Sequence, residues 1–402
     1  MKNDYKFYFV LLIPIINAVA SNTTNYFSSE IFNSGNLRAL IILIFLIPFI
    51  LKNYPSIMPS KIILLSVLYI LNLTILSGNL ITSLSNSLKY SIGVLMFPVG
   101  YYYFNTIDKF KQLIKIFIIT LIIYITNIII SNMFNLGTSD YASDTFYFGS
   151  GSVNITKEIF VLVLFAPLSL LLFPNYRKVL YLLYTIGLII SIIGIKRSVL
   201  LSVAASAIVY MFLTNFKGSY IKSIVVGIFL VLSILIIFPS IFETFIVRLN
   251  ARESQLTLDE ENIESEARFN EVLLVLNNWN DKSIYFKLFG SEPFNDRYYY
   301  KTLRMLHTDY MIMLNGTGIV GIFFWFYIFF VIFKEKNKYK YLIHSNRLNI
   351  EMNAIFTALL FSQLLMSISS TVYAISLRSL IFLYWGATIS LFRSQRSINA
   401  NN

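Results

Sequence analysis

The chain has 402 residues, of which 56% are hydrophobic and only 13% are charged. Soluble domains carry about 25% charged residues, so this composition excludes a soluble globular protein and predicts one that crosses a membrane many times. The net charge of +12 would suit a nucleic-acid partner, but most of the charges lie in short loops between apolar runs, which argues against nucleic acid.

Apolar runs long enough to span a bilayer recur along the whole chain. A spanning helix needs about 20 mostly apolar residues, and twelve runs approach this length: residues 5–20, 37–51, 62–80, 90–104, 113–133, 159–173, 179–195, 199–213, 223–242, 308–333, 352–370 and 373–392. The predicted fold is therefore all-α, a single polytopic membrane domain over residues 1–402. Two alternatives stay open. Several runs are short enough for one to be re-entrant, and Ala18-Val19-Ala20 resembles a signal-peptide cleavage site.

The lysines and arginines of the short loops predict the orientation, because cytoplasmic loops retain them. With the N-terminus in the cytoplasm, the cytoplasmic segments hold eighteen such residues and the short outer connections hold six. We therefore expect both termini in the cytoplasm. The six outer residues are Arg38, Lys89, Lys157, Lys196, Arg197 and Arg378.

One long polar segment, residues 243–307, interrupts the apolar pattern. It holds eleven of the 20 acidic residues and eight of the 32 basic ones. Long loops cross the membrane largely regardless of their charge, so this segment is predicted to be a large loop on the outer, periplasmic side.

The first candidate site is Lys196-Arg197-Ser198, which lies between two apolar runs with almost no loop. A charge at membrane depth costs about 2.5–3.5 kcal/mol, and these two cations lie on the side that basic residues avoid. A turn whose basic side chains reach out to water is the alternative. We interpret the turn as an anion site.

The second candidate, Arg268, lies in a stretch of the loop, residues 263–279, whose apolar residues recur at helical spacing. This pattern predicts an amphipathic helix lying on the membrane or on the protein. Arg268 falls at the border of the apolar face, and its spacing alone favours an ordinary surface pairing with Glu264 or Glu271 over a functional role.

The third candidate is His307, which directly precedes Thr308 and Asp309 at the predicted start of a spanning helix. Free N–H groups and the helix dipole favour anions at such a place. With an unperturbed pKa of about 6.5, histidine can accept a proton at neutral pH. A polar residue that only marks the helix end is the alternative. Gly316, Gly318 and Gly321 follow in the apolar run and predict close packing of helices.

This layout resembles the superfamily of O-antigen polymerases (Wzy) and O-antigen ligases, bacterial inner-membrane glycosyltransferases. The resemblance covers the twelve predicted spans with one large periplasmic loop, and it is most specific at three places: the Lys196-Arg197-Ser198 turn, Arg268, and His307 ahead of Gly318-Ile-Val-Gly321. It implies that Arg197, Arg268 and His307 are catalytic, and that Lys196 helps the two arginines to bind a diphosphate.

The resemblance further implies the substrates: a glycan on undecaprenyl diphosphate, transferred to a sugar hydroxyl without a metal or other cofactor. It leaves a chain-length regulator protein open as a partner beside the lipid bilayer. A ligase would instead transfer the glycan to lipid A–core. The Phe-, Tyr- and Ile-rich composition favours the polymerase. A flippase would place ionisable residues near the bilayer midplane, and a structural scaffold has the least support. The chain also has no cysteine, which excludes disulfides and thiolate metal sites.

Overall fold

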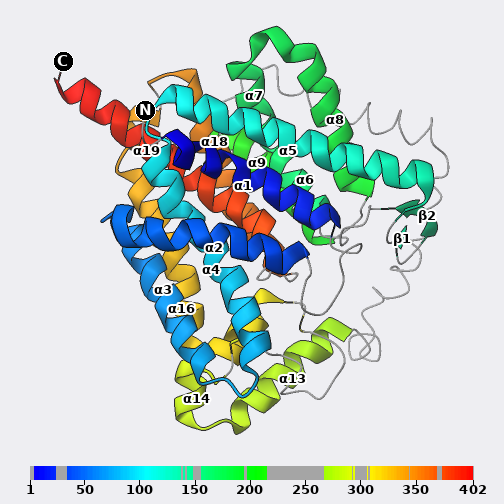
Figure 1. The fold of residues 1–402 in the computed structure, drawn as a ribbon, viewed down its shortest axis with the longest axis vertical. Helices are drawn as coiled ribbons and strands as arrows, with labels where there is room; N and C mark the ends of the chain where they lie inside the picture. The colour runs from blue at the N-terminus through cyan, green and yellow to red at the C-terminus, as the bar shows by residue number, and fades with distance from the viewer. Residues whose placement is uncertain are drawn as a thin grey trace.

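The computed structural model describes residues 4–23, 34–136, 139–140, 143–147, 155–193, 197–214, 267–291, 293–294, 306, 308–343, 345–368 and 374–401. These residues are almost all helical, as predicted (Figure 1). The helices of the first half are α1 (Asp4–Thr23), α2 (Ser34–Asn53), α3 (Met58–Ile75), α4 (Leu80–Tyr103), α5 (Ile107–Phe134), α6 (Ile155–Val163), α7 (Ala166–Leu172), the 3-10 turn η1 (Pro174–Tyr176), α8 (Arg177–Ile193) and α9 (Arg197–Thr214). After them come α13 (Ala267–Asp281), α14 (Ile284–Phe289), α16 (Asp309–Asn337), α17 (Lys340–Ile343), α18 (Arg347–Met366) and α19 (Ile375–Asn401). Two short strands, β1 (Ser139–Asp140) and β2 (Ser143–Tyr147), pair antiparallel.

Within the described residues, seven helices are long and apolar enough to cross a membrane, and the bent pair α6–α7 would add an eighth. This is the architecture of a multi-pass membrane protein. The predicted span 223–242 lies outside the described residues, so the count of twelve stays a prediction. So does the outer position of the loop.

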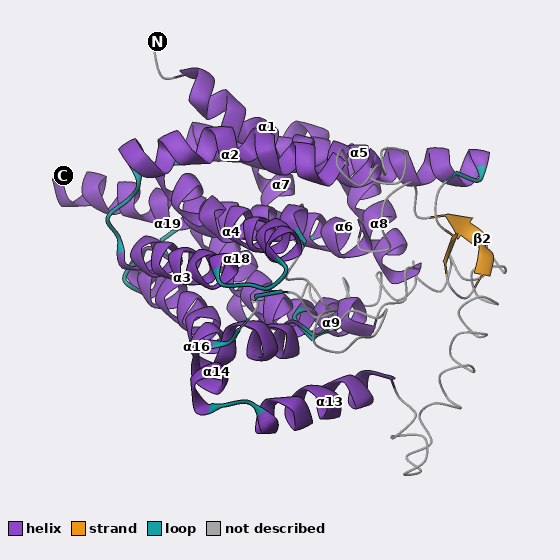
Figure 2. Ribbon diagram, turned by 60° about the horizontal axis from the view of Figure 1, so that its bottom comes forward, coloured by secondary structure: helices purple, strands orange, loops and turns teal. Residues whose placement is uncertain are grey.

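The centre of the bundle is the pair of helices α4 and α19. A Cβ atom added to Gly100 would lie 2.2 Å from the carbonyl oxygen of Leu383, and one added to Gly386 would lie 2.1 Å from that of Phe97. The two backbones can therefore approach this closely only because both residues are glycine. Figure 2 shows α1, α2 and α5 on one side of this centre, with α13 and α14 at the opposite edge of the molecule.

Helix α4 begins at Leu80, ten residues before the predicted span 90–104. The Asn79 side chain caps it by accepting a hydrogen bond from the Thr82 N–H at 3.4 Å. The added segment is too polar to be recognised as part of a span, but its Ser83, Asn86 and Ser87 side chains are buried among neighbouring helices. A helix shielded from lipid by protein can carry such residues, and this one brings Lys89 into the helical body.

Two of the predicted spans are not continuous helices. α6 and α7 meet at a bend of 45°, just before Pro167, which cannot donate the helical hydrogen bond. α16 is broken at Gly318, whose φ of 64° lies in the left-handed region that glycine adopts freely. This second break is the place where α14, in the described part of the polar segment, packs against α16.

Candidate functional site

The four predicted site residues are only partly described. Lys196 and His307 lie outside the described residues. Arg197 is the first residue of α9 and Arg268 the second of α13, and the structure gives the backbone of both. The convergence of the four side chains therefore stays a prediction.

Other ionisable residues occupy the interior of the bundle, and all of them except Lys89 lie within the first five residues of their helices. These are Arg38 in α2, Lys89 in α4, Lys157 and Glu158 in α6, Asp309 in α16 and Arg378 in α19. Under the predicted orientation all of these helices start on the outer side. Four of the six cations that the orientation leaves there thus lie inside the protein: Arg38 and Lys89 are half-buried, and Lys157 and Arg378 are buried.

Arg38 belongs to a hydrogen-bond network that joins five helices. Its Nη1 donates to the Oγ of Ser376 at 2.8 Å and to that of Ser21 at 3.2 Å. Ser376 also hydrogen-bonds Glu158, which accepts a hydrogen bond from the Tyr124 hydroxyl. The network thus connects α1, α2, α5, α6 and α19 around one guanidinium group.

Lys89 lies within electrostatic range of Arg38, so two like charges share one region. The Nζ of Lys89 donates to the Oδ1 of Asn86 at 3.2 Å. In the part of the chain that the structure describes, neither cation of this Arg38–Lys89 pair is in an ion pair within 4 Å. The Nε of Arg38 and both polar side-chain atoms of the neighbouring Asn17 are buried without a hydrogen-bond partner. The region therefore has positive charge and hydrogen-bonding capacity to offer an anion.

Arg378, by contrast, is a structural anchor. It is fully buried with Asp309, and the Nη2 and Oδ2 atoms of the two residues lie 3.6 Å apart. Its guanidinium carbon lies 4.4 Å from the ring centroid of Trp325 and 5.3 Å from that of Tyr90. Gly93 leaves the space for it, because a Cβ there would lie 2.8 Å from the Cβ of Arg378. Arg378 thus joins α4, α16 and α19.

The described part of the polar segment folds back onto the helical body. α14 packs against α16 at its break, where the Cα of Gly290 faces the carbonyl oxygen of Gly316 and that of Gly318 faces the carbonyl oxygen of Leu288. The Tyr69 hydroxyl lies 2.6 Å from the Phe289 carbonyl oxygen and 2.7 Å from that of Thr317, one on each side of this contact. Tyr69 therefore ties α14 to the broken helix.

The same segment reaches the Arg38–Lys89 pair through Asn86. The Nδ2 of Asn86 donates to the carbonyl oxygen of Phe294 at 3.0 Å, while its Oδ1 accepts from Lys89. The Phe294 ring packs against Tyr90, with centroids 5.7 Å apart. Asn86 thus contacts both the folded-back segment and one cation of the pair.

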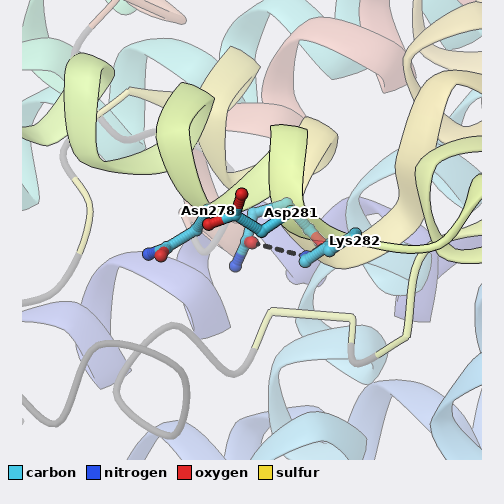
Figure 3. A pocket seen from close by; sticks show the side chains of 4 residues that line it. Asn278, Asp281 and Lys282 are labelled. Atoms are coloured by element: carbon cyan, nitrogen blue, oxygen red, sulfur yellow. Dashed lines mark hydrogen bonds between the residues drawn. The ribbon is translucent and has the colours of Figure 1, made fainter.

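A pocket of about 230 Å³ opens between the end of α13 and α16, lined by atoms of Asn278, Asp281, Lys282 and Asn315 (Figure 3). The Nζ of Lys282 donates to the backbone oxygen of Asn315 at 3.0 Å and to its Oδ1 at 2.9 Å. A cation that binds carbonyls freed by a helix break also interacts favourably with the helix dipole. Lys282 therefore fixes the floor of the pocket.

No group of three or more histidines, cysteines, aspartates or glutamates that could hold a metal ion occurs among the described residues. No family model matches the chain, and no curated protein matches it. The functional case therefore depends on the geometry above.

Arg38 and Lys89 are not among the predicted site residues. The sequence marks both only as cations on the side that basic residues avoid, and this exception to the positive-inside pattern is the signal that points to them. Their proximity depends on the packing of α2 against α4, which the sequence does not reveal.

Proposed function

We propose that this protein is a polytopic glycosyltransferase that polymerises a surface polysaccharide. It transfers a glycan from undecaprenyl diphosphate to the terminal sugar hydroxyl of another lipid-linked repeat unit at the outer face of the inner membrane. The observation that carries this proposal is the half-buried Arg38–Lys89 pair. Among the described residues neither cation is in an ion pair within 4 Å, and the nearby Glu158 supplies one negative charge for the two cations. Charge inside a membrane bundle is costly, and a lipid diphosphate would supply the negative charge that balances the second cation.

The two cations suit different parts of that group. The planar guanidinium of Arg38 can bind two phosphate oxygens at once, and Lys89 adds a point charge. Arg197, Arg268 and Lys196 are proposed to complete the anion site. Negative charge develops on the diphosphate as it leaves, so fixed cations stabilise the transition state more than the ground state.

The proposed reaction is a direct displacement with inversion at the anomeric carbon. The acceptor oxygen forms a bond to that carbon, while the bond from the carbon to the diphosphate oxygen breaks and its electron pair leaves with the diphosphate. His307 takes the proton of the acceptor hydroxyl, a general-base role that typically contributes about 10²–10⁴-fold. Trapping a covalent glycosyl-enzyme adduct would contradict this mechanism.

A transporter is the second candidate, and a specific observation favours it. Transporters build their sites from discontinuous helices, and here α16 is broken at Gly318 and the α6–α7 pair is bent. Against this reading, most of the buried or half-buried ionisable residues that the structure describes lie within the first five residues of their helices. The exceptions among them are Lys89, at the tenth position of α4, and Glu335 and Lys336, near the end of α16. This placement supports chemistry at one face over passage through the midplane.

Deletion of the gene in the native host, followed by electrophoresis of the surface polysaccharide, separates the candidates. Loss of a polymerase leaves core carrying a single repeat unit. Loss of a ligase leaves bare core and lipid-linked polymer, and loss of a flippase leaves lipid-linked single repeats on the cytoplasmic side. Either of the last two results would overturn the polymerase proposal.

Arg38→Ala and Lys89→Ala test the site itself. Each removes one charge from the proposed diphosphate site, so we expect chain extension to fall on the order of 100-fold, as it does when one transition-state donor is lost. Polymer length on gels and protein abundance in membranes are the measurements. Lys52→Ala is the matched control, because Lys52 is exposed at the other end of α2. Normal polymer from both site variants would remove the pair from the mechanism.

A further inference from the structure

We propose that the pocket lined by Asn278, Asp281, Lys282 and Asn315 binds a sugar ring of the acceptor glycan. The pocket is distinct from the Arg38–Lys89 pair, and naming its ligand as the acceptor rests on the proposed function. The binding of a hydroxyl-rich ligand follows from the pocket alone.

The lining groups favour an uncharged ligand with many hydroxyls. Asp281 and Lys282 carry opposite charges, so their net charge is zero, and the two asparagine side chains each offer a donor and an acceptor. A diphosphate in this pocket would be repelled by the negative charge of the Asp281 carboxylate. The volume of about 230 Å³ is below the roughly 300–1,000 Å³ of pockets for drug-sized ligands. This size suits a single ring.

Asn315 supplies a second, independent observation. It is only 1% exposed, and its Nδ2 is buried without a hydrogen-bond partner. Because Lys282 donates to the other side-chain atom, that atom must be the oxygen, and the free group must be the N–H donor. A buried donor without a partner costs about 1–3 kcal/mol. A ligand hydroxyl that accepts from it would recover this cost.

The pocket is preformed by the backbone. The break at Gly318 ends the first half of α16 beside Asn315, and the docking of α14 through Gly290 holds the end of α13 over it. Lys282 donates to Asn315, and Figure 3 shows Asn278 and Asp281 on the helix that ends beside Lys282. A ligand would therefore bind without first ordering these side chains, which lowers the entropic cost of binding.

The test is calorimetric titration of the full-length chain in lipid nanodiscs. The probe is the oligosaccharide mixture obtained by partial acid hydrolysis of the native host's surface polysaccharide. We expect Asn278→Ala to weaken binding about tenfold, the usual effect of losing one or two hydrogen bonds. Asn277→Ala is the matched control, since it changes the same residue type on the same helix, is exposed, and lies outside the pocket lining. It should bind as the parent does.

Asn315→Ala should weaken binding at least as much. Because this substitution can also disturb α16, the decisive variant is Asn278→Ala, which changes an exposed residue. Equal affinity of Asn278→Ala and the parent, or no binding by the parent, would overturn the proposal. The outcome is separable from the proposed function. Weakened glycan binding together with a flippase phenotype on deletion would keep the subsite and reject the polymerase. A polymerase phenotype with unchanged binding would do the reverse.

Discussion

Arg378 and Asp309 form the pair of residues on which the junction of α16 and α19 depends. Both are fully buried, and the guanidinium lies against the rings of Tyr90 and Trp325. We expect Arg378→Ala to lower the free energy of unfolding by about 3–5 kcal/mol, because the carboxylate of Asp309 would remain buried without its cation. The measurement is the thermal unfolding midpoint of the detergent-purified protein.

Arg396→Ala is the control for this variant, since Arg396 is an exposed arginine on the same helix. The double variant Asp309→Asn with Arg378→Ala should unfold at a higher temperature than Arg378→Ala alone, because it removes the uncompensated charge. An Arg378→Ala protein as stable as the parent would show that the pair contributes little.

The sequence could not have paired these residues. Asp309 and Arg378 are far apart in the chain, and Arg378 was predicted only as one of six cations in outer connections. Lys89 also falls in a predicted outer connection, because hydropathy treats every segment as if it were surrounded by lipid, and the segment before residue 90 is too polar for that. The polar start of α4 is helical because other helices surround it. The sequence therefore identified the unusual charges but not what they contact.

Among the elements, the contact between α14 and the break in α16 is the most constrained. Gly318 has a φ of 64°, and a Cβ on it would lie 2.5 Å from the carbonyl oxygen of Leu288. With its ψ of −169°, Gly318 lies in a backbone region that essentially only glycine adopts, and for any other L-residue this conformation costs on the order of 1–3 kcal/mol. We therefore expect Gly318→Ala to release α14, so that trypsin cleaves at Lys282 about ten times faster in nanodiscs, a ratio that corresponds to about 1.4 kcal/mol.

Ile319→Ala provides the comparison, because Ile319 is the next residue along α16 and its side chain is 44% exposed. It should be cleaved at the parental rate. If Gly318→Ala were as resistant as the parent, the break would not be what holds the segment in place.

Most described helices lie within a few residues of the predicted spans, as α5 does for the prediction 113–133 and α18 for 352–370. The breaks within helices are harder to predict from the sequence. Gly316, Gly318 and Gly321 predict close packing of helices, and Gly318 does admit the backbone of the helix α14, but the break in α16 at this residue is not predicted. Its backbone conformation depends on a segment about 30 residues earlier, and local pattern cannot supply such a partner.

At the scale of the whole molecule, the proposed chemistry depends on which side of the membrane each helix begins. The described helices include up to eight apolar spans. The more polar α4 is not one of them, but it packs between them. The predicted orientation rests on the count of eighteen short-loop cations against six in the sequence. The side can be measured directly, because the chain has no cysteine and single cysteines can be introduced without background.

We expect Asn277→Cys on α13 to react with a membrane-impermeant maleimide in spheroplasts, because the predicted orientation puts the loop outside. Tyr176→Cys, between α7 and α8, and Ser397→Cys, near the end of α19, should react only after lysis. All three positions are exposed, so protection would reflect the membrane and not burial in the protein. If Asn277→Cys reacted only after lysis and the other two before it, the helix starts that hold Arg38 and Lys89 would face the cytoplasm. A lipid-linked glycan on the outer face could not then reach this pair, and the proposed function would fail together with the orientation.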